Sequence, residues 1–119
     1  MTENGPGFAV ELHETSSGQC PVAKFIQGLS KTGEAKCYHE LDLLEQFGIE
    51  LGGRRIKQLT RVLWELRFTA DHSAIRLLFT IDRSQFIVVH GFKKQSQKTP
   101  RRELAVAERR ATHYHENHG

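Results

Sequence analysis

Four charged side chains in the second half of the chain have the chemistry needed to bind and cleave a phosphodiester. Glu65 and Arg67 stand two residues apart, Arg76 follows in the next apolar segment, and Lys93 ends the one after it. Guanidinium groups bind phosphate through paired hydrogen bonds, and nearby cations stabilise the charge that develops on phosphorus. The alternative is that Glu65 pairs with Arg67 or Arg76 on a solvated face, where such pairs contribute little.

The elements that would position these residues are three strands with alternating apolar residues. Segments 62–68, 74–81 and 85–93 are separated by the turn-like stretches 69–73 and 82–84, which predicts an antiparallel meander. Because side chains alternate along a strand, each segment has two faces. The predicted core face holds Trp64, Leu66, Phe68, Ile75, Leu77, Phe79, Ile81, Phe86, Val88 and Phe92. The other face holds Leu63, Glu65, Arg67, Ala74, Arg76, Leu78, Thr80, Ile87, Val89, Gly91 and Lys93.

Histidines offer a second possible source of acid–base chemistry. His90 precedes a basic stretch, but its parity places it on the core face, which favours a hydrogen-bonded core histidine over a general base. His113, His115 and His118 fit no zinc-binding spacing and are interpreted as part of a solvated tail. No metal or other cofactor is expected.

The remaining segments predict helices around the sheet and an α+β fold in a single domain, 1–119. A short edge strand at 8–12 precedes a helix at 21–29, and Gly33 separates it from a second helix at 34–47 that Gly48 ends. These two helices form a predicted αα-hairpin. Thr99 and Pro100 open a last helix, as N-cap and first residue, that has few apolar residues and should pack lightly. Segments 1–6 and about 113–119 are expected to be flexible.

Charge is distributed unevenly around a net value of +3. Acids dominate 34–50, whereas 54–61 and 93–102 contain cations and no acid, which indicates a polyanionic ligand. Solvated loops and a solvated helix are the alternative. The chain lacks a membrane-spanning apolar run and a signal peptide, so we expect a cytoplasmic protein, and Cys20 and Cys37 are expected to be bystander thiols.

Several strings in the second half carry a family resemblance. "LWELRF" (63–68), "AIRLLFTID" (74–82), "VVHGFKKQSQKTP" (88–100) and "RRELAVAERR" (101–110) resemble the phage-derived HigB-like toxins of the RelE/ParE superfamily. The resemblance implies a RelE-like fold and a cognate antitoxin, often a helix-turn-helix (HigA-like) repressor. It also implies a toxin that enters the ribosomal decoding site and cuts mRNA there.

The resemblance also implies residue roles. Arg67, Arg76, Lys93 and Lys94 match the family's catalytic positions, Lys98 matches its basic loop, and a C-terminal tyrosine of some branches has no secure counterpart in Tyr114. The implied reaction is attack of the mRNA 2′-hydroxyl on the adjacent phosphodiester, which needs no metal. Glu65 would act as base or orient Arg67. The residues expected to anchor RNA of the ribosome are Arg54, Arg55, Lys57, Arg61, Lys98 and Arg101.

Two other functions remain compatible with the sequence. A ParE-like inhibitor of DNA gyrase would use the same fold without nuclease activity. A non-enzymatic nucleic-acid-binding or regulatory protein would use the same cations only for affinity. The acidic stretch 34–50 is either the antitoxin-binding surface or a solvated outer face.

Overall fold

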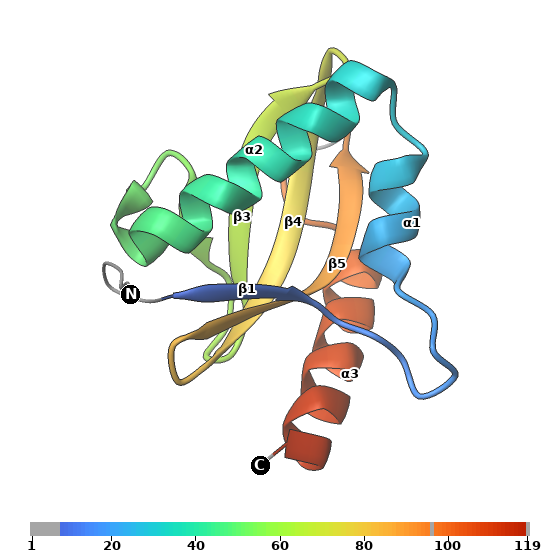
Figure 1. The fold of residues 1–119 in the computed structure, drawn as a ribbon, viewed down its shortest axis with the longest axis vertical. Coiled ribbons are helices and arrows are strands. Elements are labelled where there is room, and N and C mark those ends of the chain that lie inside the picture. The colour runs from blue at the N-terminus through green and yellow to red at the C-terminus, as the bar shows by residue number, and fades with distance from the viewer. Residues whose placement is uncertain (1–7, 96, 119) are drawn as a thin grey trace, which may run out of the picture.

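The computed structural model describes residues 8–95 and 97–118, which form a five-stranded mixed sheet with helices on both faces (Figure 1). The predicted flexible segment 1–6 lies outside the described residues. Strand order is β1-β5-β4-β3-β2, with β1 parallel to β5 and the other pairs antiparallel. In chain order the elements are β1 (Ala9–Leu12), α1 (Pro21–Gln27), α2 (Lys31–Phe47), the 3₁₀ helix η1 (Gly48–Leu51), β2 (Ile56–Gln58), β3 (Trp64–Ala70), β4 (Ser73–Asp82), β5 (Gln85–Lys94) and α3 (Arg101–His118).

The structure confirms three predictions made from the sequence: the α+β class, the edge strand β1, and the antiparallel meander of β3, β4 and β5. The sequence did not reveal β2, whose three residues are too few to show a clear alternation. This strand places Lys57 directly across from Glu65 of β3.

Two separate apolar cores hold the layers together, one on each face of the sheet. The first packs α1 and α2, through residues such as Ile26 and Leu44, onto Leu66, Leu77 and Phe79. The second packs α3 onto the opposite face, and it contains Leu63, Leu78, Ile87, Val89, Phe92, Ala107, Ala111 and Tyr114. The prediction of a lightly packed last helix was therefore wrong. Small side chains at Ala107 and Ala111 share one helix face, so α3 lies close against the sheet.

A β-bulge in β5 divides these two faces in an unexpected way. Leu78 of β4 pairs with His90, but the next residue, Phe79, pairs with Val88, so Val89 is an extra residue in β5. An extra residue reverses the alternation beyond it. His90 and Phe92 consequently face α3, whereas Gly91 and Lys93 face α1 and α2. The predicted faces of β5 are wrong from His90 onward for this reason.

The helix α2 begins three residues earlier than predicted, and Gly33 lies inside it rather than before it. Ser30 is the N-cap, since its hydroxyl accepts a hydrogen bond from the Gly33 N–H at 3.0 Å. Asp71, from the turn between β3 and β4, accepts hydrogen bonds from the Ser30 N–H at 2.9 Å and from its hydroxyl. A Cβ on Gly33 would lie 2.6 Å from Asp71 Oδ1, so the glycine permits this contact.

The two cysteines are free thiols, and burial raises the pKa of Cys37 to about 11, which keeps it protonated at neutral pH. No helix within residues 8–95 and 97–118 is both long and apolar enough to cross a membrane.

Substitution of Gly91 tests the packing of β5 under α1. A Cβ there would lie 2.8 Å from the side chains of both Leu77 and Phe25, so Gly91→Ala should destabilise the fold by about 1–3 kcal/mol. Gly53→Ala is the matched control, because a Cβ at Gly53 has nothing within 4 Å. Urea unfolding of the two variants measures the difference, and equal midpoints would contradict the packing described.

Candidate functional site

Most of the charged residues predicted from the sequence lie together on β3 and β4, near the N-terminal end of α3. Arg67 of β3 and Arg76 of β4 are direct cross-strand partners, and Lys57 of β2 is the partner of Glu65. Lys94 pairs with Ala74, two residues before Arg76, and so lies on the same face. An open pocket of about 490 Å³ is lined by Arg67, Ala74, Arg76, Lys94, Gln95 and Gln97. Hereafter the cationic cluster means Lys57, Arg67, Arg76 and Lys94 together with Glu65.

Glu65 is the buried centre of the cationic cluster, with only 2% of its side chain exposed. Its Oε1 lies 3.8 Å from Arg67 Nε, and its Oε2 lies 3.8 Å from Arg76 Nε. The hydroxyl of Thr99, just before α3, donates a hydrogen bond to Oε2 at 3.0 Å. A buried carboxylate needs such partners, and here they engage both oxygens. These contacts favour a carboxylate that orients two guanidinium groups over one that removes protons.

Arg76 is the most enclosed cation of the cluster, with 11% of its side chain exposed. Its Nη1 donates to the backbone carbonyl of Ile75 at 2.9 Å, whereas its buried Nε has no hydrogen-bond partner among the described residues. Burial lowers the pKa of Arg76, and the Glu65 charge partly opposes that effect. The guanidinium stays charged, since arginine loses its proton only at extreme pH. An anion in the pocket would relieve this under-paired positive charge.

Lys94 has the environment expected of a group that transfers protons. Its pKa is lowered by burial first and by the Arg76 charge next, with Arg67 and Lys57 acting in the same direction. Glu65 opposes these effects. A lysine with a lowered pKa is a stronger acid, and its neutral form is more accessible near neutral pH.

Four of the five predicted catalytic residues lie together, and one does not. Glu65, Arg67, Arg76 and Lys94 form the cluster, but Lys93 pairs with Ile75 of the first core and faces α1 and α2. The bulge at Val89 moved it there.

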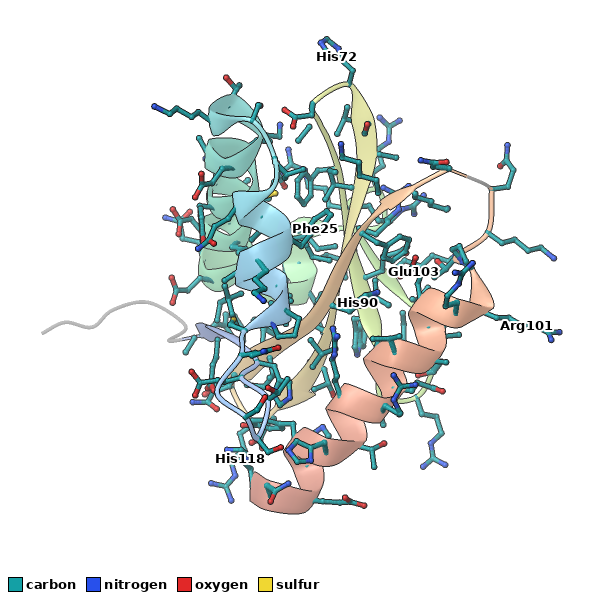
Figure 2. All side chains as sticks on the ribbon, turned by 90° about the vertical axis from the view of Figure 1, so that its right-hand side faces the viewer. Phe25, His72, His90, Arg101, Glu103 and His118 are labelled. Atoms are coloured by element: carbon teal, nitrogen blue, oxygen red, sulfur yellow. The ribbon has the colours of Figure 1, made fainter. Side chains whose placement is uncertain are left out.

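The cations expected to anchor RNA lie in different places. Lys57 is part of the cationic cluster instead. The Arg55 guanidinium lies 3.4 Å from the buried Glu40 carboxylate of α2, which Lys36 also approaches at 3.6 Å. Arg55 therefore offsets a buried acid while 44% of its side chain stays exposed. Arg54, Arg61, Lys98 and Arg101 are also exposed, and Figure 2 shows Arg101 pointing away from the molecule at the start of α3.

His90 is indeed a hydrogen-bonded histidine, but it lies under α3 (Figure 2) rather than in the first core. Arg110 Nη1 lies 3.1 Å from Nδ1, and Glu103 Oε1 lies 2.6 Å from Nε2. Since an arginine only donates, Nδ1 must accept, and Nε2 must carry the hydrogen that Glu103 accepts. This arrangement requires neutral imidazole. Burial is the largest influence and lowers the pKa of His90; the Glu103 carboxylate raises it, the Arg110 charge lowers it, and the net shift is downward.

Tyr114 lies far from the cluster. Its hydroxyl donates a hydrogen bond to Asp82 Oδ2 at 2.9 Å, and burial together with that carboxylate raises its pKa to about 12. Tyr114 follows Thr99, which contacts Glu65, by fifteen residues. At 1.5 Å per residue this corresponds to a separation of about 22 Å along the helix. Tyr114 therefore stabilises the end of α3 and takes no part in the cationic cluster.

The neutral state of His90 predicts a pH dependence of stability. Its folded pKa lies below the unfolded value, so the unfolded chain binds more protons as the pH falls. The stabilisation is complete above about pH 6.5 and is lost as the pH falls through the folded pKa. Because the pKa of His13 shifts in the same direction, the informative quantity is the difference in unfolding free energy between the native chain and His90→Gln. We expect that difference to shrink from pH 7.5 to pH 5; a constant or growing difference would contradict a neutral His90.

Comparison with known proteins supplies the family of this chain. The search of curated proteins finds no match. The model of the family described as phage-derived protein Gp49-like (DUF891) matches residues 24–112, which include β2, β3, β4, β5 and most of α3. This family is associated with the toxins of toxin–antitoxin pairs. The chain therefore belongs to the Gp49-like family of phage-derived proteins, itself part of the RelE/HigB-type toxin family.

Proposed function

We propose that the protein is the toxin of a type II toxin–antitoxin pair and that it cuts mRNA on the ribosome. The observation that carries the proposal is the cationic cluster, in which Arg67, Arg76 and Lys94 line one open pocket around a buried carboxylate. Family membership supports the toxin role. In this proposal the sheet and its flanking helices are a variant of the RelE-like fold, and the protein acts in the cytoplasm, where ribosomes are.

The proposed reaction is transesterification within the RNA backbone. The 2′-oxygen attacks the adjacent phosphorus, its proton goes to a base, and the bond from phosphorus to the 5′-oxygen breaks. The leaving 5′-oxygen takes a proton, which yields a 2′,3′-cyclic phosphate and a 5′-hydroxyl end. Arg67 and Arg76 hold the phosphate and stabilise the charge that develops on it. We assign donation of the proton to the leaving 5′-oxygen to Lys94, because its pKa is lowered and it lines the same pocket. The proton of the 2′-hydroxyl passes to solvent water in this open pocket.

Glu65 acts in this mechanism as a positioning residue. It is shielded from solvent, holds the two guanidinium groups and accepts from Thr99, so the reacting 2′-hydroxyl cannot easily reach it. Lys57, across from Glu65, adds positive charge to the side of the cluster formed by β2.

The proposed partner is a cognate antitoxin of the helix-turn-helix, HigA-like kind. Its proposed binding surface is the outer face of α2, where Asp42 and Glu45 are exposed with Glu50 just beyond the helix. Glu40 is excluded from that surface because it is buried against Arg55. Neutralising the exposed acids and measuring antitoxin affinity tests the assignment.

The decisive experiment is induction of the chain in bacteria, followed by mapping of mRNA 5′ ends and of DNA breaks. The proposal expects translation arrest with mRNA cuts in phase with codons. Intact mRNA with DNA damage would instead indicate a gyrase inhibitor, and toxicity without either lesion would indicate a binding protein.

Lys94 and Lys93 form a matched pair for testing the mechanism, because they are adjacent but point to opposite faces of β5. Lys94→Gln should reduce mRNA cleavage on purified ribosomes by about 10²-fold or more, as expected for removal of a proton-transfer group. Lys93→Gln removes the same charge outside the pocket and should reduce cleavage far less. Equal reductions in the two variants would show that net charge, and not this site, limits the rate.

Glu65→Gln separates positioning from base catalysis. If Glu65 only orients the arginines, the variant should cleave more slowly, by up to about 10²-fold for a misplaced phosphate clamp, while the pH–rate profile keeps its acidic limb. Thr99→Val, which removes the hydrogen bond to Glu65, should act in the same direction with a smaller effect. A Glu65→Gln profile that becomes flat at acidic pH would identify Glu65 as the base.

A further inference from the structure

A second pocket with the character of an anion site lies at the other end of α3. It has a volume of about 260 Å³ and is lined by His13, Thr15, Ser16, Arg109, Arg110 and His113. The first three residues follow β1, and the last three belong to α3. Figure 2 shows the loop between β1 and α1 beside the half of α3 that ends at His118. No acidic side chain of the described residues lines this pocket, which we call the distal pocket.

His13 is the feature that points to a ligand. Its side chain is almost fully buried, with 4% of the residue exposed, and it lines the distal pocket. Its backbone N–H donates a hydrogen bond to the Val88 carbonyl of β5 at 2.9 Å, which holds this part of the chain beside the sheet. Rings of His113 and Tyr114 contact it edge-on, yet neither imidazole nitrogen has a hydrogen-bond partner among the residues that the structure describes. Among the described residues, Arg76 Nε is the only fully buried side-chain polar atom without a partner, so the His13 ring nitrogens reach the pocket, where an anion would accept a hydrogen bond.

The other donors around the pocket are partly fixed in advance. Arg110 is held by the bonds from its Nη1 to the Val89 carbonyl, at 3.0 Å, and to His90. Arg109 and His113 are exposed, and the hydroxyls of Thr15 and Ser16 complete the opposite wall. Guanidinium, imidazole and hydroxyl donors that approach from several sides suit a tetrahedral phosphate.

We propose that the distal pocket binds a backbone phosphate of the RNA that the protein engages, at a site separate from the cationic cluster. This inference rests on the proposed function. Arg109 and His113 follow Thr99 by ten and fourteen residues, so the two sites are about 15 to 20 Å apart along α3. Each strand of a duplex carries one phosphate per roughly 3.4 Å. Even at this close spacing, a short oligonucleotide is long enough to reach both sites. Arg102 and Arg109 are exposed and two turns apart, so they share the intervening helix surface.

The test is binding of a fluorescent 2′-O-methyl uridine 12-mer, which has no free 2′-hydroxyl and therefore cannot be cleaved. The double variant Arg109→Gln/His113→Gln should weaken binding by about tenfold and reduce the slope of log K against log salt by roughly 0.7 for each phosphate that the protein no longer neutralises. Lys24→Gln is the control, because it removes one exposed positive charge from α1, on the other face of the sheet. Fluorescence anisotropy at several salt concentrations gives both quantities.

A second measurement locates the ligand. The ring resonances of His13 should shift in proton–carbon NMR spectra of the native chain when the 12-mer is added, because the ring lines the pocket. Unchanged affinity in the double variant, or a His13 ring that does not respond, would overturn the proposal. A response to a glutamate-rich peptide but not to the 12-mer would assign the pocket to an acidic protein partner and also overturn it.

These outcomes are independent of mRNA cleavage. If induction leaves mRNA intact while the 12-mer still requires Arg109 and His113, the proposed function fails and the distal pocket stands. If mRNA is cut but the double variant binds the 12-mer normally, the function stands and the distal pocket fails.

Discussion

The extra residue at Val89 is the constraint on which the arrangement of functional side chains depends. Before the bulge, β5 alternates in register with β4, and Phe86 and Val88 fill the first core while Ile87 fills the second. After the bulge the faces are exchanged, so that His90 and Phe92 meet α3. The same exchange directs Lys94 toward Arg76 and directs Lys93 away. One inserted residue thus decides both how the last helix is held and which lysine joins the cationic cluster.

Burial of Glu65 has an electrostatic cost that only its neighbours can offset. Two guanidinium groups and the Thr99 hydroxyl surround the carboxylate, which links three separate parts of the chain: β3, β4 and the segment before α3. Removing one partner of a buried charge is expensive because the charge left behind stays desolvated. The cluster nevertheless holds four cations against one acid, so it retains positive charge for a ligand. Structural pairing and an excess of positive charge therefore coexist at one place.

The helix α3 connects the two regions where we propose that an anion binds. Its buried side, with Ala107, Ala111 and Tyr114, packs on the sheet, and His90 bridges Glu103 and Arg110 beneath it. Its first residues adjoin the cationic cluster, and its last turns form one wall of the distal pocket. A rigid helix keeps these regions at a set separation, which is a suitable arrangement for holding an extended polyanion at two points.

Much of this organisation could be predicted from the sequence. Alternating apolar residues determined the meander, the parity rule placed Glu65, Arg67 and Arg76 on one face, and the family-like strings 63–68 and 88–100 indicated the toxin family that the Gp49-like match supports. These features are local, since the period of two between side chains is a property of a single strand.

Only the tertiary structure decided the rest. The bulge arises from the pairing between β4 and β5, and the place of Lys57 beside Glu65 arises from the pairing between β2 and β3. The close packing of α3 on the sheet depends on small helix residues that fit that surface. His13 and Arg109 are nearly one hundred residues apart, so no spacing rule brings them together. Each of these outcomes depends on contacts between segments distant in sequence, and their energies are determined by packing and charge burial that no single segment contains.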